Sequence, residues 1–193
     1  MNFEWFSIIG LLFKIVPRYK YLASLAFISI ALYFTTQTIA DVHNAGSIIN
    51  GLVDDYDYQE ADRIIIGGLP ENYNGVYMLR DLDDKALGLV ESLDWIGGKK
   101  VNSDINVLSK YNVLDTLGHL DMKMLDSVTV QVWNIKGGSW FWRKGVGMQG
   151  YQKEGVEVTM KDGHFDARIL NVPKGTIFIY PEGRYWKEVP AKN

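Results

Sequence analysis

The amino-acid sequence predicts an α+β protein: an N-terminal interfacial helix and one transmembrane helix, followed by a compact domain with two short helices and an antiparallel β-meander. Two observations carry this prediction. Residues 21–40 form an uncharged, mostly apolar run, which as a helix is long enough to cross a hydrocarbon layer of about 30 Å. From residue 127 onward, apolar and polar residues alternate between Gly and Pro turns, which is typical of antiparallel strands. We expect the meander to form a sandwich or a small open barrel.

Residues 1–18 are predicted to form an amphipathic helix on the cytoplasmic surface of the membrane. A helical wheel of this segment shows a narrow polar stripe and a broad apolar surface. The segment is too short to span, and Pro17 ends it because proline lacks an N–H and clashes with the preceding turn. We interpret it as an interfacial helix. Its aromatic residues Trp5, Phe6 and Phe13 are candidate contacts with other transmembrane subunits, although the same pattern fits a second anchor that only improves retention.

Residues 19–40 are predicted to be the transmembrane helix. Its few Ser and Thr residues are compatible with lipid because their hydroxyls can bond to carbonyls of their own helix. Phe27 and Tyr33 are candidate contacts with partner helices within the membrane. A cleaved secretory signal is the rival interpretation, with Thr38-Ile39-Ala40 as the cleavage site. The apolar run is long for a signal, whose hydrophobic region has about 7–15 residues, so a retained anchor is favoured.

The charges on either side of the span predict its orientation. Three basic residues precede it, Lys14, Arg18 and Lys20, whereas Asp41 follows it and the next basic residue is Arg63. Positive charge remains on the cytoplasmic side. We therefore expect a single-pass protein of the inner (cytoplasmic) membrane with a cytoplasmic N-terminus and a periplasmic or otherwise extracytoplasmic C-terminal domain.

Residues 41–62 are predicted to be a membrane-exit helix, reaching about Val53, and an acidic linker. Residues 54–62 contain five acids and no apolar periodicity, which is typical of a solvated segment. A calcium loop starting at Asp55 is disfavoured because it lacks the glycine at position six and the closing glutamate, where Ile66 stands. The first 40 residues carry three basic residues and one acid, net +2; since the whole chain is −3, residues 41–193 carry −5. That balance gives no indication of nucleic-acid binding.

Residues 63–193 are long enough for one hydrophobic core and are predicted to form one domain. In its first half we expect strands at 63–68 and 76–81, then a helix through residues 86–93, whose apolar residues recur at helical spacing. A second helix is predicted to begin at Ser103, as its N-cap, and to reach about Leu117.

In the second half we expect strands at 128–133, around 140–142, 156–160, 164–170, 176–180 and 184–189. The Asp162-Gly163 pair between two alternating runs is a hairpin signal, because glycine supplies a positive φ. The glycines of GVGMQG, residues 145–150, match a dinucleotide-binding pattern, but a meander surrounds them, so we interpret them as strand-edge or bulge glycines.

Catalytic chemistry has little support in the sequence. The chain contains no cysteine, which excludes thiol catalysis, disulfides and iron–sulfur ligation. Its three histidines, His43, His119 and His164, fall in separate segments without a metal-binding spacing. We therefore predict no catalytic, metal-binding or cofactor-binding residues, and no cofactor.

Aromatic density is the feature that core packing explains least. Five residues of the outer domain are candidate contacts with a partner protein or lipid: Trp133, Trp140, Trp142, Tyr185 and Trp186. The expected function is a non-catalytic accessory, structural or assembly subunit of a larger membrane complex, with integral membrane proteins and the bilayer as its partners. Two alternatives stay open: an extracytoplasmic barrel-like module that binds a hydrophobic ligand or lipid, and a membrane-anchored extracytoplasmic enzyme.

Overall fold

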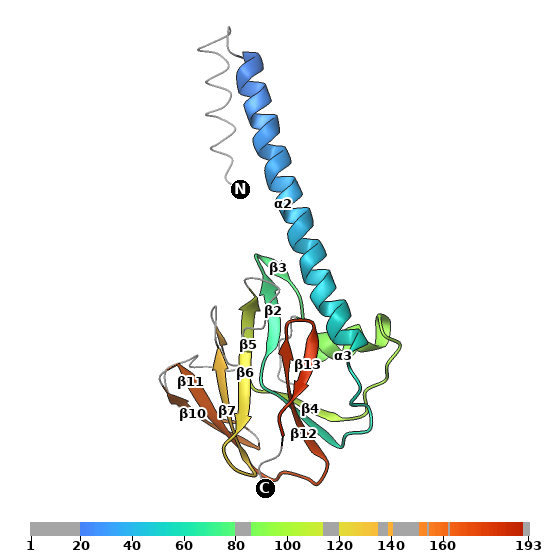
Figure 1. Ribbon diagram of the computed structural model, residues 1–193, viewed down its shortest axis with the longest axis vertical. Coiled ribbons are helices and arrows are strands. Elements are labelled where there is room, and N and C mark those ends of the chain that lie inside the picture. The colour runs from blue at the N-terminus through green and yellow to red at the C-terminus, as the bar shows by residue number, and fades with distance from the viewer. Residues whose placement is uncertain are drawn as a thin grey trace. The chain divides into compact units, whose positions relative to one another are not determined.

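A computed structural model describes residues 20–79, 86–113, 120–134, 139–140, 151–153, 155–161 and 163–190 (Figure 1). The chain divides into two compact units, Met1–Asp41 and Val42–Asn193, and the helix α2 (Lys20–Asp54) contributes residues to both. The predicted α+β class is confirmed, with a long N-terminal helix followed by a domain rich in strands. The predicted interfacial helix, with Trp5, Phe6 and Phe13, lies outside the described residues.

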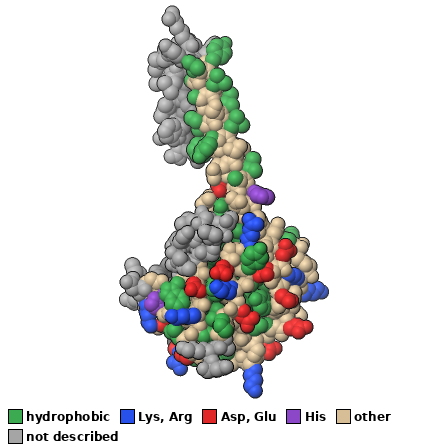
Figure 2. All heavy atoms as spheres, viewed as in Figure 1, with side chains coloured by type: hydrophobic (Ala, Val, Ile, Leu, Met, Phe, Trp, Pro, Cys, Tyr) green, Lys and Arg blue, Asp and Glu red, His purple; other side chains and the backbone are tan. Residues whose placement is uncertain are grey.

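The part of α2 that belongs to the first unit exposes its apolar side chains. The large hydrophobic residues from Tyr21 to Ile39 are 46–72% exposed, and Figure 2 shows hydrophobic side chains along this length of helix. Thr35, Thr36 and Thr38 each donate a hydroxyl to a carbonyl three or four residues earlier, at 2.8–2.9 Å. The expected back-bonding is thus confirmed for these threonines, so their hydroxyls do not need water. By length and composition this helix is able to cross a membrane, a test that a secretory signal also passes.

The part of α2 that belongs to the second unit is a core helix. Ala45, Ile48, Leu52 and Val53 are at most 2% exposed, and their spacing places them along one helical face. The prediction that the helix continues to about residue 53 is confirmed, since α2 ends at Asp54.

The first sheet is built around a buried parallel strand. Its order is β13 (Tyr185–Glu188), β12 (Thr176–Glu182), β1 (Arg63–Ile66) and β4 (Asp104–Val107). Strand β1 pairs in parallel with both β12 and β4, while β12 and β13 form an antiparallel hairpin. Ile64, Ile65 and Ile66 are all fully buried, as expected for a central strand covered on both faces.

The second sheet contains the predicted antiparallel hairpin. Its order is β6 (Leu120–Met124), β7 (Thr129–Asn134), β11 (His164–Ile169), β10 (Val156–Lys161) and β9 (Tyr151–Lys153). All four pairs of neighbouring strands in it are antiparallel. Lys161 pairs with His164, so two residues connect β10 to β11, and Gly163 takes the positive φ of 74° that the turn requires.

The third sheet has the order β3 (Val76–Tyr77), β2 (Leu69–Tyr73), β5 (Lys110–Val113) and β8 (Ser139–Trp140). Strands β2 and β5 are parallel, with a register shift between Pro70 and Asn72. Because this sheet and the first both contain parallel pairs, the domain is not a simple antiparallel meander. None of the sheets formed by the described strands closes into a barrel.

The second predicted short helix, from Ser103 to about Leu117, is wrong. Residues 104–107 and 110–113 are the strands β4 and β5 instead. Ile105 and Val107 are both buried in β4, which is the two-residue period of a strand, and pairing with β1 overrides the local helical spacing. The other short helix is confirmed as α3 (Leu87–Trp95), which buries Leu89 and Leu93.

Candidate functional site

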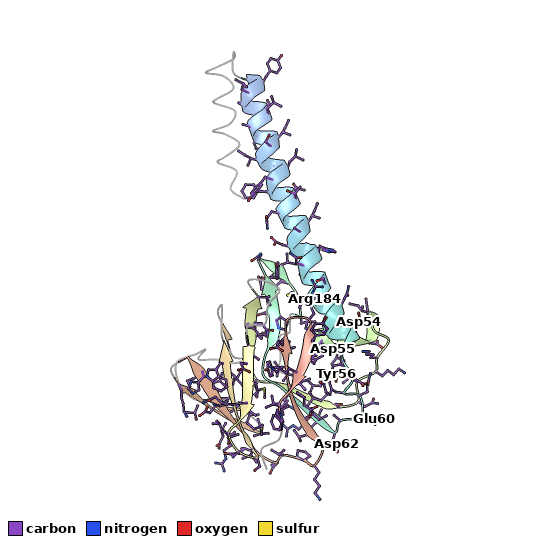
Figure 3. The ribbon with its side chains drawn as sticks, in the orientation of Figure 1. Asp54, Asp55, Tyr56, Glu60, Asp62 and Arg184 are labelled. Carbon is purple, nitrogen blue, oxygen red and sulfur yellow. The ribbon has the colours of Figure 1, made fainter. Side chains whose placement is uncertain are left out.

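The end of α2 meets two distant segments of the domain in a polar junction. We define the helix-end junction as residues 51–56, 97–99 and 184–186; Figure 3 labels Asp54, Asp55, Tyr56 and Arg184 within it. The last four carbonyl groups of any α-helix have no partner inside the helix. In this domain the carbonyl of Gly51 accepts from the backbone N of Asp55, and further partners come from the loop after α3 and from the β12–β13 hairpin.

Lys99 supplies most of the C-terminal cap. Its Nζ atom donates to the carbonyl oxygens of Val53, Asp54 and Tyr56 at 2.7, 2.9 and 2.7 Å. An ammonium has three donors and no acceptor, so the three bonds use its full capacity. A positive charge at a helix C-terminus also complements the helix dipole.

Trp186 holds the same helix end from the hairpin side. Its indole Nε1 donates to the carbonyl oxygen of Leu52 at 2.8 Å, and its backbone N donates to Oδ2 of Asp55 at 2.6 Å. Its ring meets the ring of Tyr56 edge to face, with centroids 6.2 Å apart. Trp186 is 7% exposed, so it is a core residue of the domain and does not offer its ring to a partner; we do not retain it as a contact residue.

Two glycines permit the close approach of these segments. A Cβ atom at Gly51 would lie 2.6 Å from Cβ of Arg184 and 2.8 Å from its carbonyl oxygen. A Cβ atom at Gly97 would lie 2.7 Å from Cγ1 of Val53. Real Cβ contacts are not that short, so any side chain at either glycine would push the segments apart.

The acidic segment after the helix is part of the domain, which corrects its interpretation as a solvated linker. Tyr56 is 1% exposed and packs edge to face on Tyr58, with ring centroids 5.5 Å apart. The acids point outward instead: Asp54, Asp55, Asp57, Glu60 and Asp62 are all exposed. The five acidic residues of the segment are therefore solvated, while Tyr56 anchors it in the core.

Two open grooves flank this acidic segment. The first, of about 520 Å³, is lined by Ser47, Asn50, Gly51, Asp54, Asp55, Arg184 and Tyr185. The second, of about 540 Å³, is lined by Asp57, Tyr58, Gln59, Glu60, Ala61, Gly175, Thr176 and Ile177. Burial, followed by the negative charges of Glu188, Asp55 and Asp57, raises the pKa of Tyr58. Among the described residues no three His, Cys, Asp or Glu side chains converge as metal ligands would.

A second polar cluster lies on the five-stranded sheet around Trp133. Nζ of Lys123 lies 4.6 Å from the centroid of the Trp133 ring, and the His164 ring lies 5.8 Å from it at an angle of 37°. Beside them, Asp166 pairs with Lys161 and accepts a hydrogen bond from Nε2 of Gln131 at 2.9 Å.

Asp166 is 9% exposed. Burial acts to raise its pKa, but the hydrogen bonds from Lys161 and Gln131 and the nearby positive charges outweigh burial and lower it. Lys161 thus neutralises the Asp166 carboxylate, and half-buried Trp133 is held in place between Lys123 and His164.

The other predicted contact residues fall in different places. Phe27 and Tyr33 are 46% and 65% exposed on the apolar part of α2, and Tyr185 is 65% exposed at the first groove. The structure describes only the backbone of Trp140, and Trp142 lies outside the described residues, as do His119 and residues 145–150. The described structure thus brings none of these residues together with Trp133.

Sequence reasoning missed two residues. Lys99 was not distinguishable, because a lysine that caps a helix 45 positions earlier has no local signature. Trp95 was detectable: Leu89 and Leu93 define the buried face of α3, and a residue two positions after Leu93 lies about 200° round the helix from it. Trp95 is 87% exposed.

Comparisons of the chain with protein-family models, with curated proteins and with solved structures find no match.

Proposed function

We propose that this chain is a single-pass membrane protein whose outer domain serves as a non-catalytic accessory, structural or assembly subunit of a larger membrane complex. The observation that carries the proposal is the change of burial along α2. Its large side chains from Tyr21 to Ile39 are exposed and apolar, whereas Ala45, Ile48, Leu52 and Val53 are buried in the domain core.

In water, the exposed apolar surface of this part of α2 would be energetically unfavourable. Water-exposed apolar patches beyond a few hundred Å² are rare on soluble proteins, and burying a Leu, Ile or Phe side chain contributes about 1.5–3 kcal/mol. The exposed part of α2 contains eight exposed Leu, Ile and Phe residues and two exposed Tyr residues between Tyr21 and Ile39. A lipid bilayer covers all of them at once and requires no charged group to be buried, since residues 21–40 are uncharged.

The local geometry at the end of the apolar run supports a retained span over a cleaved signal. The helix continues without a break through Thr38, Ile39 and Ala40, where a signal would be cleaved. Nε2 of Gln37 donates to Oδ1 of Asp41 at 3.4 Å, so the run's one amide side chain reaches toward the first charged residue, as polar groups do at a membrane interface. The helix then ends in the helix-end junction, where Lys99 and Trp186 bind its last carbonyls.

The orientation and the partners are further parts of the proposal. The basic residues before the span and Asp41 after it support a cytoplasmic N-terminus and an extracytoplasmic domain in the inner membrane. The exposed aromatic residues Phe27 and Tyr33 support contact with integral membrane partners, because aromatic anchors recur in protein interfaces.

Membrane retention tests the anchor. Ile30 lies at the middle of the apolar run, where an arginine costs about 2.5–3.5 kcal/mol on insertion scales. Ile30→Arg should therefore move a large fraction of the chain from the carbonate-resistant membrane fraction to the soluble or degraded fraction. The matched control is His43→Arg, at an exposed position of the same helix beyond the run, which should stay in the membrane. Equal retention of both variants contradicts the span, and an intact mass lacking residues 1–40 contradicts the retained anchor.

The partners are tested separately by substitutions that keep the span apolar. The Phe27→Leu, Tyr33→Leu double variant should remain in the membrane while losing co-purifying subunits in mild detergent. Leu25→Ile, at another exposed position of the run, is the control. If the double variant keeps the same partners as the control, Phe27 and Tyr33 are lipid-facing only.

A further inference from the structure

Helix α3 carries apolar side chains on two sides but is buried on one. Leu89 and Leu93 are fully buried, whereas Leu87 is 55% and Trp95 87% exposed. Trp95 is the most exposed large hydrophobic side chain of the described residues. An exposed tryptophan in a helix of nine residues is informative, because isolated exposed leucines are ordinary but an unburied Trp leaves a large apolar area in water.

The exposed residues of α3 form a stripe opposite its buried face. At 100° per residue, Leu87, Glu91, Asp94 and Trp95 fall within an arc of about 100°, and Leu89 and Leu93 lie on the other side. We call Leu87, Glu91, Asp94 and Trp95 the α3 stripe. It places two acidic side chains between an apolar residue near each end of the helix, and all four residues are exposed.

Charge argues against two possible occupants of the stripe. In an antiparallel pair with a second copy, Leu87 would meet Trp95 but Glu91 would face its own copy, and like charges at close range are unfavourable. Anionic headgroups would be repelled by Glu91 and Asp94 in the same way.

We propose that the α3 stripe is a docking site for a segment of another extracytoplasmic protein. The segment carries apolar side chains that cover Leu87 and Trp95, and Lys or Arg residues that face Glu91 and Asp94. This inference rests on the proposed function, since it assigns the surface by which the outer domain of the subunit contacts its partner. Trp95 is the anchor, because buried Trp side chains dominate interface energies while rim contacts contribute little.

Site-specific photo-crosslinking in native membranes tests the inference. A benzoylphenylalanine at position 87 leaves Trp95 in place, and the same probe at Tyr77, which is 61% exposed on β3, is the control position. The probe at 87 should crosslink a second protein, and the crosslinked peptide should contain apolar residues next to Lys or Arg. The probe at 77 should not give that product.

Second-site variants make the test specific. Trp95→Ala should weaken the association about thirtyfold, as expected for loss of a Trp anchor, and should reduce the crosslink at least tenfold. Glu91→Lys with Asp94→Lys should abolish it, and Glu91→Gln with Asp94→Asn should reduce it less. Because Trp95 is 87% exposed, Trp95→Ala should leave the melting temperature within a few degrees of the unmodified chain.

Each other outcome overturns the inference. A crosslink to a second copy of the chain assigns the stripe to self-association, and a crosslink to lipid assigns it to the membrane surface. A crosslink that persists in the Trp95→Ala or charge-reversal variants shows that the stripe is not the contact, and so does the absence of any crosslink. Carbonate extraction of the same membranes separates these results from failure of the anchor, because the chain stays in the membrane if only the docking inference is wrong.

Discussion

The side-chain ammonium of Lys99 lies 2.7 Å from the carbonyl oxygen of Val53, a residue 46 positions earlier in the chain. The same ammonium bonds to the carbonyl oxygens of Asp54 and Tyr56. A single side chain thus binds the last two carbonyls of α2, Val53 and Asp54, and the carbonyl of Tyr56 just beyond the helix. The final turn of the helix is therefore held by the domain into which it packs.

Replacement of Lys99 should destabilise the domain. Lys99→Met keeps the aliphatic length and removes all three donors, and hydrogen bonds to charged groups contribute about 1.5–3 kcal/mol. We expect a loss of about 2 kcal/mol, or a melting temperature lower by roughly 5 °C for a domain of this size, measured for the full chain in detergent. Lys100→Met, at the exposed neighbouring position, is the control. If the two variants have the same melting temperature, Lys99 does not cap the helix.

Two glycines of α2 should respond in opposite directions to alanine. Alanine is favoured over glycine by about 1 kcal/mol in a helix interior. Gly46 has no atom within 4 Å of its virtual Cβ, so Gly46→Ala should stabilise the chain; at Gly51 the Cβ would meet Arg184 at 2.6 Å, so Gly51→Ala should destabilise it by about 1–3 kcal/mol. Urea denaturation monitored by circular dichroism measures both. Stabilisation by Gly51→Ala contradicts the close approach of the hairpin.

At high pH, Tyr56→Phe should be more stable than the unmodified chain. Its hydroxyl is buried and has no hydrogen-bond partner among the described residues, so Tyr56→Phe should be neutral or stabilising by about 1 kcal/mol at pH 7. Burial, followed by the charge of Tyr58, raises the pKa of Tyr56 above its usual value. A tyrosine whose pKa is raised by folding contributes its full stabilisation below the pKa of the unfolded chain, near 10. That contribution falls as the pH rises above this value.

The raised pKa of Tyr56 should make the folded chain less stable as the pH rises above 10. Above pH 10 the unfolded chain releases the Tyr56 proton and the folded chain retains it, so stability should fall by about 1.4 kcal/mol per pH unit for this group. Tyr56→Phe should remove that part of the slope between pH 10 and 12, measured by urea denaturation. The fall that remains belongs to other buried tyrosines such as Tyr111, whose pKa burial also raises. If stability falls with pH equally steeply in the two proteins, Tyr56 loses its proton as readily in the folded chain as in the unfolded chain, and its pKa is not raised.

The parts of the fold that depend on neighbouring residues were predictable, and those that depend on distant pairing were not. The apolar run of α2 and the hairpin of β10 and β11 follow from local composition and from the glycine of the turn. Residues 103–117 contain apolar residues at helical spacing, yet β4 lies in parallel beside β1, about 40 residues earlier in the chain. A parallel partner leaves no mark in the local pattern, so the sheet could not be inferred there.

In the candidate site, too, local sequence did not reveal contacts between residues that are distant in the chain. Trp186 was predicted as a surface contact because aromatic density alone was visible, but it binds Leu52, 134 positions away, and is buried. Tyr56 lies within nine residues that include five acids, and local charge predicted a solvated linker although the ring is in the core. Trp95 could have been recognised, because it falls off the apolar face that Leu89 and Leu93 define.

The cluster around Trp133 should lose stability in acid. The pKa of Asp166 is lowered, because its hydrogen bonds with Lys161 and Gln131 and the nearby positive charges outweigh the effect of burial. A carboxyl group whose pKa is lowered by folding stabilises the folded chain above the pKa of the unfolded chain, near 4. That stabilisation is lost as the pH falls through the pKa of the folded chain. Asp166→Asn should lower the melting temperature at pH 7 and flatten its decline below pH 4. Glu157→Gln, in an exposed pair with Arg168, should change neither. A wild-type acid slope in Asp166→Asn contradicts the role of this carboxylate.

The chain has no cysteine, so single-cysteine variants can report directly on whether α2 crosses the membrane. We would introduce cysteine at Ser7, Ile30 or His43 and treat intact cells with a membrane-impermeant maleimide. We expect the variant at 43 to be labelled from outside and the variant at 7 to be labelled only after the membrane is permeabilised. The variant at 30 should resist labelling both before and after permeabilisation. Labelling at position 30 as fast as at position 43 would contradict the membrane span, and labelling at 7 from outside with protection at 43 would contradict its orientation.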